Sequence, residues 1–324
     1  QFSEPQAELI SRVMIFVLSA PLRFAANPAG SCAARGAPRL ASQAKALTSE
    51  LRNLGANQIK KQLHVNDNQA KQYEKNLTTI ESKHAVPACS LFDSSFYSAI
   101  DMAHFDPDDS EWAQSYVRIL SGFYGILRPY DAISTASLPV TLSTKLTTSK
   151  GKHLRDYWRE PVLRELEDAL RSCPMPVLVD CTSEQDRDVF NLEALPEGTS
   201  IHSVEFRLRD SRMNNEARGE FVRWALERRC MTVEELVQFR GYVDDEDPAT
   251  FRLNTRASND KEIVFEEAGS DERSWSRKLQ ESGMTKGAFM AEVAGGKNRY
   301  KRAEVKKALN ESERKKKRKP TAVY

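Results

Sequence analysis

The sequence predicts an α/β (mixed α+β) fold: a single compact domain in which helices surround a mixed sheet. Three observations support this prediction. Short apolar runs typical of strands alternate with segments of helical periodicity. No fixed internal repeat, such as a solenoid would show, is present. The chain has 324 residues, of which 40% are apolar and 29% charged, which is the composition of a globular domain with a sizeable core.

Charge divides the chain into three parts. Between 297 and 319, twelve Lys or Arg residues face three acids, so this segment carries +9 and the rest of the chain −7 of the total of +2. We expect a lead-in at 1–12, the folded domain at 13–268, and a basic, partly helical or disordered extension at 269–324. The run 314–319 is typical both of a solvated tail without a specific partner and of a nuclear-localisation signal or nucleic-acid-binding arm.

The first elements of the domain are a strand and several helices. The apolar run 13–18 is too short to cross a membrane and predicts a buried strand. Leucine and alanine at helical spacing predict a helix over 40–54, which Gly55 ends. Two further helices with a polar break between them are predicted over 57–76, as a helix-hairpin-helix element or as a simple packed pair.

A further helix and a turn follow. Asp108 and Asp109 are suited to cap a helix whose apolar face includes residues 112–120, and Gly122 is expected to end it. The apolar run 123–127 then predicts a strand. Residues 128–131, Arg-Pro-Tyr-Asp, fit a β-turn with proline at its second position.

The second half of the domain continues the alternation of strands and helices. Strands are predicted where apolar runs are bounded by proline or alternate with charged residues, and helices where a cap precedes a periodic segment. The predicted strands are 177–180, 203–209 and 263–265, and the predicted helices are 161–170, 217–228 and a short one that starts at Thr232.

Several function classes are excluded or disfavoured. The five cysteines are scattered without a Cys-x-x-Cys pair, so neither a disulfide framework nor zinc is expected. No phosphate-binding P-loop, nucleophile elbow or paired-histidine metal motif is present, and we expect no cofactor, no metal and no catalytic residues. A reducing compartment, the cytoplasm or nucleus, fits this cysteine usage, although a chain that begins with Gln1 leaves an upstream targeting segment open.

Candidate binding residues are cations next to glycines or turns. Arg128, Lys152, Arg218 and Arg223 are each suited to hold a phosphate or, alternatively, to serve as structural or surface charges. In the helical pair, turn amides and a helix N-terminus can hold backbone phosphates, with three lysines as further candidates. These lysines are Lys60, Lys61 and Lys71.

Five segments together resemble the YaaA peroxide-stress family. They are LSGFYGILRPYD at 120–131, GKHLRDYW at 151–158, VLVDCTS at 177–183, ARG at 217–219 and QFRGY at 238–242. The resemblance implies a compact α/β domain with a basic cleft, a helix-hairpin-helix element at 57–76, DNA binding, and protection against peroxide by limiting iron-driven damage.

The sequence departs from the family pattern in four places, mostly at polar positions. A family Ser-Pro-Ala-Lys-Thr is Ser-Ala-Pro-Leu-Arg at 19–23, and segments 136–141, 180–186 and 215–219 also lack family polar residues. Losing a lysine changes what a phosphate would meet. The departures therefore leave the fold supported more strongly than the chemistry of the cleft.

Three functions follow. The leading hypothesis is a monomeric DNA-binding protein of the peroxide-stress response that contacts backbone phosphates without strong sequence specificity. The alternative is an enzyme acting on a small phosphorylated or nucleoside-like ligand, with Tyr124, Asp131, Asp180 and Ser183 as ligand contacts. The third is a diverged, inactive scaffold whose tail binds partners. No membrane association is expected for any of them.

Overall fold

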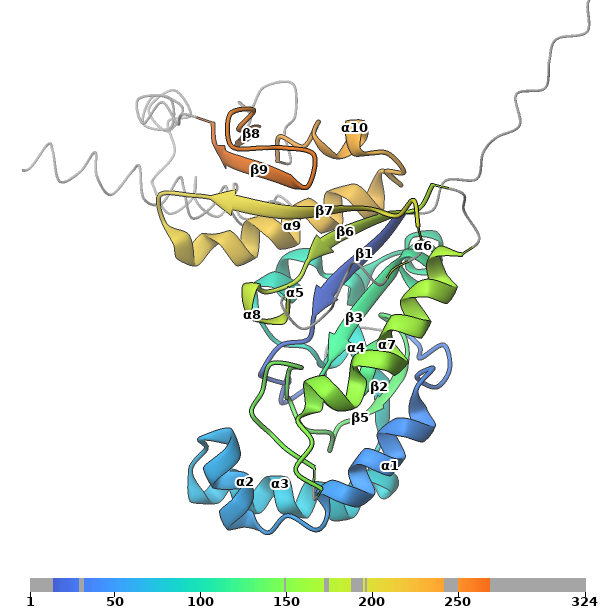
Figure 1. Cartoon of the computed structure of the whole chain (residues 1–324), viewed down its shortest axis with the longest axis vertical. Helices are drawn as coiled ribbons and strands as arrows, with labels where there is room; N and C mark the ends of the chain where they lie inside the picture. The colour runs from blue at the N-terminus through green and yellow to red at the C-terminus, as the bar shows by residue number, and fades with distance from the viewer. Residues whose placement is uncertain are drawn as a thin grey trace, which may run out of the picture.

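A seven-stranded mixed sheet forms the centre of the fold (Figure 1). The computed structural model describes residues 14–28, 32–148, 150–171, 175–187, 195, 197–241 and 250–268. The predicted lead-in and basic extension therefore lie outside the described residues. In the described part, no helix combines the length and the apolar character that crossing a membrane requires.

The sheet is parallel at its centre and antiparallel at its edges. Its strand order is β4-β3-β1-β6-β7-β9-β8, in which only the β3–β4 and β8–β9 pairs are antiparallel. A small second sheet pairs β2 with β5. The strands are β1 (Met14–Ser19), β2 (Ala85–Pro87), β3 (Val117–Ser121), β4 (Gly125–Leu127), β5 (Ala132–Ser134), β6 (Val177–Cys181), β7 (Ser200–Arg207), β8 (Phe251–Leu253) and β9 (Glu262–Glu267).

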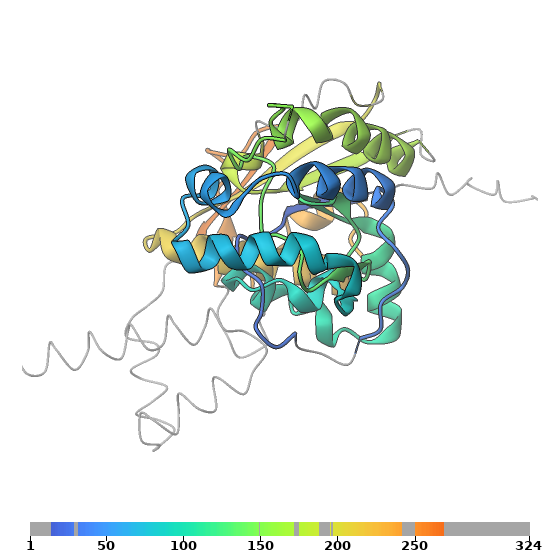
Figure 2. The same cartoon turned by 90° about the horizontal axis from the view of Figure 1, so that it is seen from below.

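Helices cover both faces of the large sheet. The described α-helices are α1 (Ala41–Leu51), α2 (Ala56–Leu63), α3 (Asp67–Thr79), α4 (Ala88–Leu91), α5 (Ser95–Ile100), α6 (Pro107–Tyr116), α7 (Leu154–Leu170), α8 (Glu184–Arg187), α9 (Asn214–Glu227) and α10 (Val233–Leu236). α5, α6 and α9 pack together on one face, while α7 lies on the other (Figures 1 and 2). Buried side chains from all these layers form one continuous apolar core. The predicted α/β fold is thereby confirmed.

The predicted helical pair is present as α2 and α3. Ile59 and Leu77 are buried on the inner side of the pair. The side chain of Asn66 caps α3 by accepting a hydrogen bond from the backbone N–H of Gln69. The pair lies at the end of the molecule opposite β8 and β9, as Figure 1 shows. Two packed helices at this place are thus established, and their role in binding is a separate question.

One predicted helix is wrong in its second half. α6 ends at Tyr116, and Val117–Ser121 is strand β3, every residue of which is buried between β1 and β4. The apolar residues 117–121 suit either a helix or a fully buried strand, and pairing with β1 decides between them. The cap is also displaced, because the Asp106 side chain accepts from the N–H of Asp109.

The helix predicted from Pro161 begins earlier. α7 starts at Leu154, and residues at helical spacing from Leu154 and Trp158 onward are buried. Pro161 therefore lies inside the helix, where its ring removes one backbone hydrogen bond. The burial of this long apolar face outweighs that local loss.

The two glycines of 120–131 allow close approaches of the chain. Gly122 ends no helix; instead its backbone lies against Thr141, and a Cβ there would be 2.3 Å from the carbonyl oxygen of Thr141. Gly125 has φ +73°, and a Cβ would be 2.5 Å from the ring of Trp158. Both glycines therefore serve the close packing of the chain, and Gly122 does not end a helix as the sequence predicted.

Candidate functional site

A cavity of about 480 Å³ opens where the order in which strands are added to the sheet reverses. The chain leaves β1 toward β3 on one side and later adds β6 on the other side of β1, so the carboxyl ends of β1 and β6 form a topological switch point. In open α/β sheets, ligands bind in the crevice at such a point. Ser19 at the end of β1, the residues 20–23 that follow it, and Ser183, which follows β6, line this cavity.

Two serine hydroxyls meet at the base of the cavity. The Oγ of Ser19 accepts a hydrogen bond from the backbone N–H of Ser183 at 2.9 Å. The Oγ of Ser183 donates to Oδ2 of Asp186 at 3.3 Å, and Asp186 is fully buried. Tyr97 donates its hydroxyl to the carbonyl oxygen of Ser19 at 2.9 Å. These contacts fix the hydroxyls as hydrogen-bonding groups for whatever enters the cavity.

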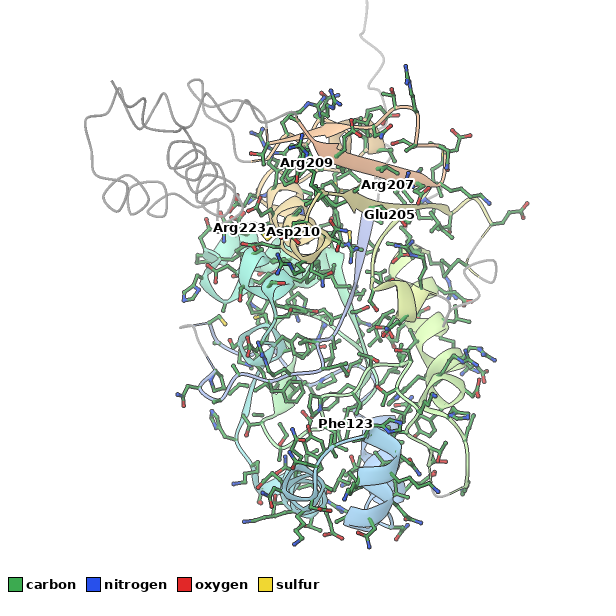
Figure 3. The ribbon with its side chains drawn as sticks, turned by 90° about the vertical axis from the view of Figure 1, so that its left-hand side faces the viewer. Phe123, Glu205, Arg207, Arg209, Asp210 and Arg223 are labelled. Carbon is green, nitrogen blue, oxygen red and sulfur yellow. The ribbon has the colours of Figure 1, made fainter. Side chains whose placement is uncertain are left out.

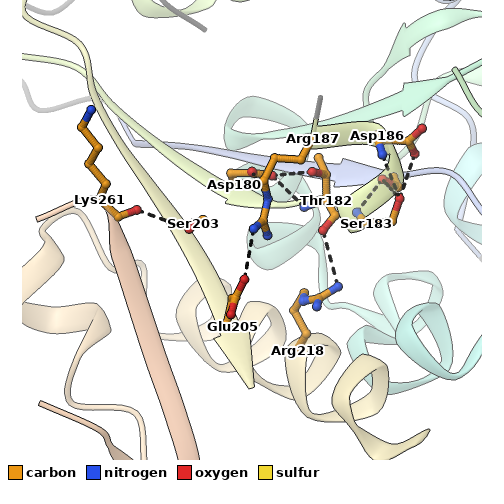
Figure 4. Close-up of polar contacts among 10 residues, drawn as sticks. Asp180, Thr182, Ser183, Asp186, Arg187, Ser203, Glu205, Arg218 and Lys261 are labelled. Atoms are coloured by element: carbon orange, nitrogen blue, oxygen red, sulfur yellow. Dashed lines mark hydrogen bonds and ion pairs between the residues drawn. The ribbon is translucent and has the colours of Figure 1, made fainter. Parts of the chain in front are cut away.

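A charged network behind the cavity holds the turn after β6 in place (Figure 4). Oδ1 of Asp180 accepts hydrogen bonds from the backbone N–H and the hydroxyl of Thr182, at 2.9 and 2.6 Å. Its Oδ2 lies 3.0 Å from Nε of Arg187, which also bonds Glu205. Because its carboxylate is occupied by these partners, Asp180 positions the turn that carries Ser183 and does not itself face the cavity lining.

Arg218 of α9 is the cation at the cavity wall. Gly219 beside it lets α9 approach α5 closely, since a Cβ at Gly219 would be 2.4 Å from the carbonyl oxygen of Phe96. Nη1 of Arg218 donates to the carbonyl oxygen of Thr182 at 3.5 Å (Figure 4), and its buried Nε has no hydrogen-bond partner. Within the described part of the chain, no carboxylate forms an ion pair with it. Burial lowers the pKa of Arg218, which remains a cation at neutral pH.

A second arginine stands at the mouth of the cavity. Arg23 and Asp93 both line the cavity and form an ion pair at 2.8 Å, with 72% of the Arg23 side chain exposed. An ion pair this exposed contributes little to stability. Arg23 is therefore able to exchange its carboxylate partner for an entering anion at small cost.

Arg128, Asp131 and Tyr124 lie in a different, buried region. Oδ1 of Asp131 lies 2.9 and 3.0 Å from Nη2 and Nε of Arg128, and its Oδ2 accepts from the backbone N–H of Arg128. The Asp131 side chain is 1% exposed. The Tyr124 hydroxyl accepts from the backbone N–H of Ser134. All three side chains have structural partners, and none of them lines the cavity.

Arg223 and Lys152 are also placed apart from the cavity lining. Arg223 forms ion pairs with Asp101 and Glu227, at 3.5 and 2.8 Å, and covers the ring of Phe105. Figure 3 shows Arg223 in the upper half of the molecule, well above Phe123 of the β3–β4 connection. Lys152 is exposed before α7, with its Nζ 6.0 Å from the centre of the Tyr157 ring.

The three lysines of the helical pair are exposed on α2 and α3. Lys60 is paired with Asp67 at 2.9 Å, and this contact lowers the pKa of Asp67. Lys61 and Lys71 form no ion pair with a described carboxylate. The capping side chain of Asn66 and the carboxylate of Asp67 already occupy the N-terminus of α3. Any anion contact of this pair therefore depends on the lysine side chains.

Of the residues predicted to bind, the structure brings together Arg218 and Ser183, with Asp180 behind them. The sequence interpretation missed Ser19, Arg23 and Asp186. Ser19 could have been found because it directly follows a buried strand, where parallel sheets place their ligands. Asp186 carried no such signal. No cluster of three or more potential metal ligands is found in the part of the chain that the structure describes.

Comparison with known proteins identifies the family. The profile described as "Peroxide stress protein YaaA" matches residues 14–247, which is most of the chain.

The chain belongs to the YaaA peroxide-stress family.

Bacterial relatives agree with this assignment. A UPF0246 protein of Cereibacter sphaeroides is 32% identical over 252 residues, covering 73% of this chain and 96% of that protein. A UPF0246 protein of Burkholderia thailandensis is 31% identical over 245 residues, covering 70% and 88%. One of Maricaulis maris is 27% identical over 236 residues, covering 70% and 86%.

The departures from the YaaA pattern converge on the cavity. Each of the four divergent segments contributes to its lining: 19–23 through all five residues, 136–141 through Thr141, 180–186 through Cys181, Ser183 and Gln185, and 215–219 through Asn215 and Arg218. These segments are far apart in the sequence, so their meeting at one place is a property of the fold. All four segments that depart from the family pattern thus contribute to the cavity wall.

Proposed function

We propose that this YaaA-family protein acts in the peroxide-stress response by binding a small phosphate-bearing ligand at the carboxyl ends of β1 and β6. The observation that carries the proposal is Arg218, a cavity-wall guanidinium that forms no ion pair with a described carboxylate. An anion that enters the cavity therefore meets a cation with no carboxylate partner to displace. A phosphate oxygen matches the guanidinium fork in charge and geometry.

The size and polarity of the cavity support a small molecule. Its volume of about 480 Å³ lies within the range of roughly 300–1,000 Å³ typical of such sites. Ser19 and Ser183 offer hydroxyls, and Phe96 and Leu22 offer apolar surface for a base or other nonpolar group. In the described lining there is no histidine that would serve as a general base. Binding is therefore the proposed activity, and no reaction is assigned.

Thermal unfolding of the full chain with millimolar nucleoside phosphates tests this proposal. We expect a concentration-dependent rise in melting temperature, and smaller rises with nucleosides that lack phosphate. Arg218→Gln should abolish the rise, while Lys152→Gln, which alters an exposed cation outside the cavity lining, should preserve it. No stabilisation by any phosphate compound, or equal stabilisation of both variants, would contradict the proposal and favour an inactive scaffold.

Nucleic-acid binding is a second candidate, supported by the exposed lysines Lys61 and Lys71 on the helical pair at one end of the molecule. Exposed cations can contact backbone phosphates without reading bases. The basic residues of 297–319, in the extension outside the described residues, would add to this attraction. In this proposal the run 314–319 is a nuclear-localisation signal or a DNA-contacting arm, and the protein works in the cytoplasm or nucleus.

Salt-dependent binding to duplex and bubble-containing DNA tests the second candidate. Replacing Lys60, Lys61 and Lys71 together by glutamine should weaken binding for all sequences alike. The salt slope should fall by about one unit for each phosphate that the variant no longer neutralises. The DNA affinity of a chain truncated after residue 268 measures how much the extension contributes to binding. Unchanged binding in the triple variant would remove the helical pair from the interface.

A further inference from the structure

Two cysteines meet on the side of the small sheet, outside the cavity lining. Cys32 is half-buried, and Cys89 in α4 is 8% exposed. Sγ of Cys32 lies 3.1 Å from Oγ of Ser90, the residue that follows Cys89 in α4, and the Cys32 and Cys89 thiols are close enough to influence each other's ionisation. The other described thiols, Cys181 and Cys230, are buried in separate places.

The backbone of residues 129–132 holds both cysteines in place. In the segment after Cys32, the N–H of Arg35 donates to the carbonyl oxygen of Tyr130, and the carbonyl oxygen of Gly36 accepts from the N–H of Ala132, both at 2.8 Å. On the other side, the N–H groups of Ala88 and Cys89 donate to the carbonyl oxygens of Asp131 and Pro129, at 3.0 and 2.9 Å. Backbone hydrogen bonds thus hold the Cys32 segment and α4 against the same stretch of chain, so the approach of the two cysteines does not depend on side-chain packing alone.

The two thiols differ in their ionisation. Hydrogen bonds from Cys89 and Ser90 lower the pKa of Cys32 to about 6, with a smaller contribution from His104. The same contact with Cys32, together with burial, raises the pKa of Cys89 far above its ordinary value. At neutral pH, Cys32 is therefore largely a thiolate, which is the reactive form, and Cys89 is a protonated thiol beside it.

We propose that Cys32 and Cys89 form a peroxide-reactive dithiol that closes to a reversible disulfide. The Cys32 thiolate attacks one oxygen of hydrogen peroxide; an S–O bond forms, the O–O bond breaks, and the leaving hydroxide takes a proton to become water. The Cys89 sulfur then attacks the Cys32 sulfenic acid, forming the S–S bond and releasing a second water that carries the Cys89 proton. In total, two thiols and one peroxide give one disulfide and two waters. This site is independent of the ligand proposed for the cavity.

Peptide mapping of the full chain after peroxide treatment tests the proposal. The reduced protein is exposed to about one equivalent of hydrogen peroxide, remaining thiols are alkylated, and the digest is analysed by mass spectrometry. We expect one linked peptide that joins Cys32 to Cys89, with two of the five thiols lost and both recovered by dithiothreitol. A Cys32 that stays a free thiol, or that pairs with a thiol of another molecule, would overturn the proposal.

Three variants separate the roles of the two cysteines. Cys89→Ser should leave Cys32 as a sulfenic acid that a dimedone probe captures, and Cys32→Ser should slow thiol loss by about tenfold or more. Cys230→Ser, which removes a buried thiol whose pKa burial raises to about 11, should react like the natural chain. As the pH is lowered, the rate at which Cys32 reacts with peroxide should fall to half of its maximum near pH 6. A half-maximal rate near pH 9 would show that Cys32 is an ordinary thiol.

Discussion

Arg128 and Arg218 look alike in the sequence and differ in the structure. Each stands beside a residue that constrains the backbone, Pro129 or Gly219, and each is a candidate phosphate ligand. Arg128 is bonded through Nε and Nη2 to Asp131, which is 1% exposed. Arg218 has a buried Nε without a partner at the wall of a cavity. The first arginine completes a turn, and the second has no carboxylate partner in the described part of the chain.

The comparison shows what distinguishes a structural arginine from a candidate binding arginine. The hydrogen-bond and ion-pair partners of the guanidinium distinguish them better than the residues next to it in the sequence do. An arginine whose charge is already paired with a buried carboxylate gains less from an anionic ligand, although some of its five N–H donors remain. An arginine that is desolvated and incompletely bonded gains from one. Matched substitutions at the two sites should therefore have effects of opposite sign on stability.

The largest expected effect is at the turn. Arg128→Met removes the partner of a buried carboxylate, and breaking a buried pair in this way costs about 3–5 kcal/mol. We expect the free energy of unfolding, measured by urea denaturation, to fall toward the lower end of that range, because Gln114 still donates to Asp131. The affinity of the folded variant for a phosphate ligand should not change. A loss below about 1 kcal/mol would place Arg128 among the exposed, dispensable cations.

Glycine substitutions come next in size. Gly125→Ala and Gly219→Ala each push a Cβ to within about 2.5 Å of another part of the chain, the Trp158 ring or the backbone of Phe96. Overpacking of this kind costs about 1–3 kcal/mol, and Gly125 adds strain because its φ is +73°. Only Gly219→Ala should also weaken ligand binding, because it moves α9 and with it Arg218.

A matched glycine provides the control for both. Gly55 lies before α2 with an extended backbone, and the nearest atom to its Cβ would be 3.9 Å away. Gly55→Ala should change the free energy of unfolding by less than about 1 kcal/mol in the same urea experiment. Equal losses at all three glycines would show that the close approaches do not set the cost.

The matched change at the cavity should stabilise the protein. Burial lowers the pKa of Arg218, so its charged form is less favourable in the folded than in the unfolded chain. Arg218→Met removes that cost and the unbonded Nε, and we expect the free energy of unfolding to rise by about 1 kcal/mol. Stabilisation by nucleoside phosphates should disappear in the same variant. A marked loss of stability would mean that Arg218 is structural, as Arg128 is.

The smallest expected effect concerns pH and lies outside both regions. Burial lowers the pKa of His202 in β7 below 6.5, against weaker opposing contributions from Asp260 and Glu234. The unfolded chain therefore takes up this proton at a higher pH than the folded one, so stability decreases as pH falls through 6.5. His202→Gln should reduce that slope in urea denaturation at several pH values. An unchanged slope would assign the dependence to other groups.

Much of the fold could be predicted from the sequence, because its signals are local. The apolar run before Ser19 became β1, and the alternation of 203–207 became the two-faced strand β7. Residues 117–121 were misassigned, since an apolar run without alternation fits both a helix and a buried strand until its neighbours are known. The preference of proline for the first turn of a helix places the start of α7 too late, at Pro161, because burial of Leu154 and Trp158 extends the helix toward its N-terminus.

Local sequence signals are enough to predict the family, the alternation of strands and helices, and two of the residues that line the cavity, Ser183 and Arg218. The folded chain adds that Ser19 bonds Ser183, that Asp131 pairs with Arg128, and that Cys32 lies against the end of α4 that carries Cys89. The physical reason is distance along the chain. Periodicity and turn chemistry act between residues a few positions apart, whereas the charge, burial and bonding that define a site come from segments that parallel strands and close helix packing bring together.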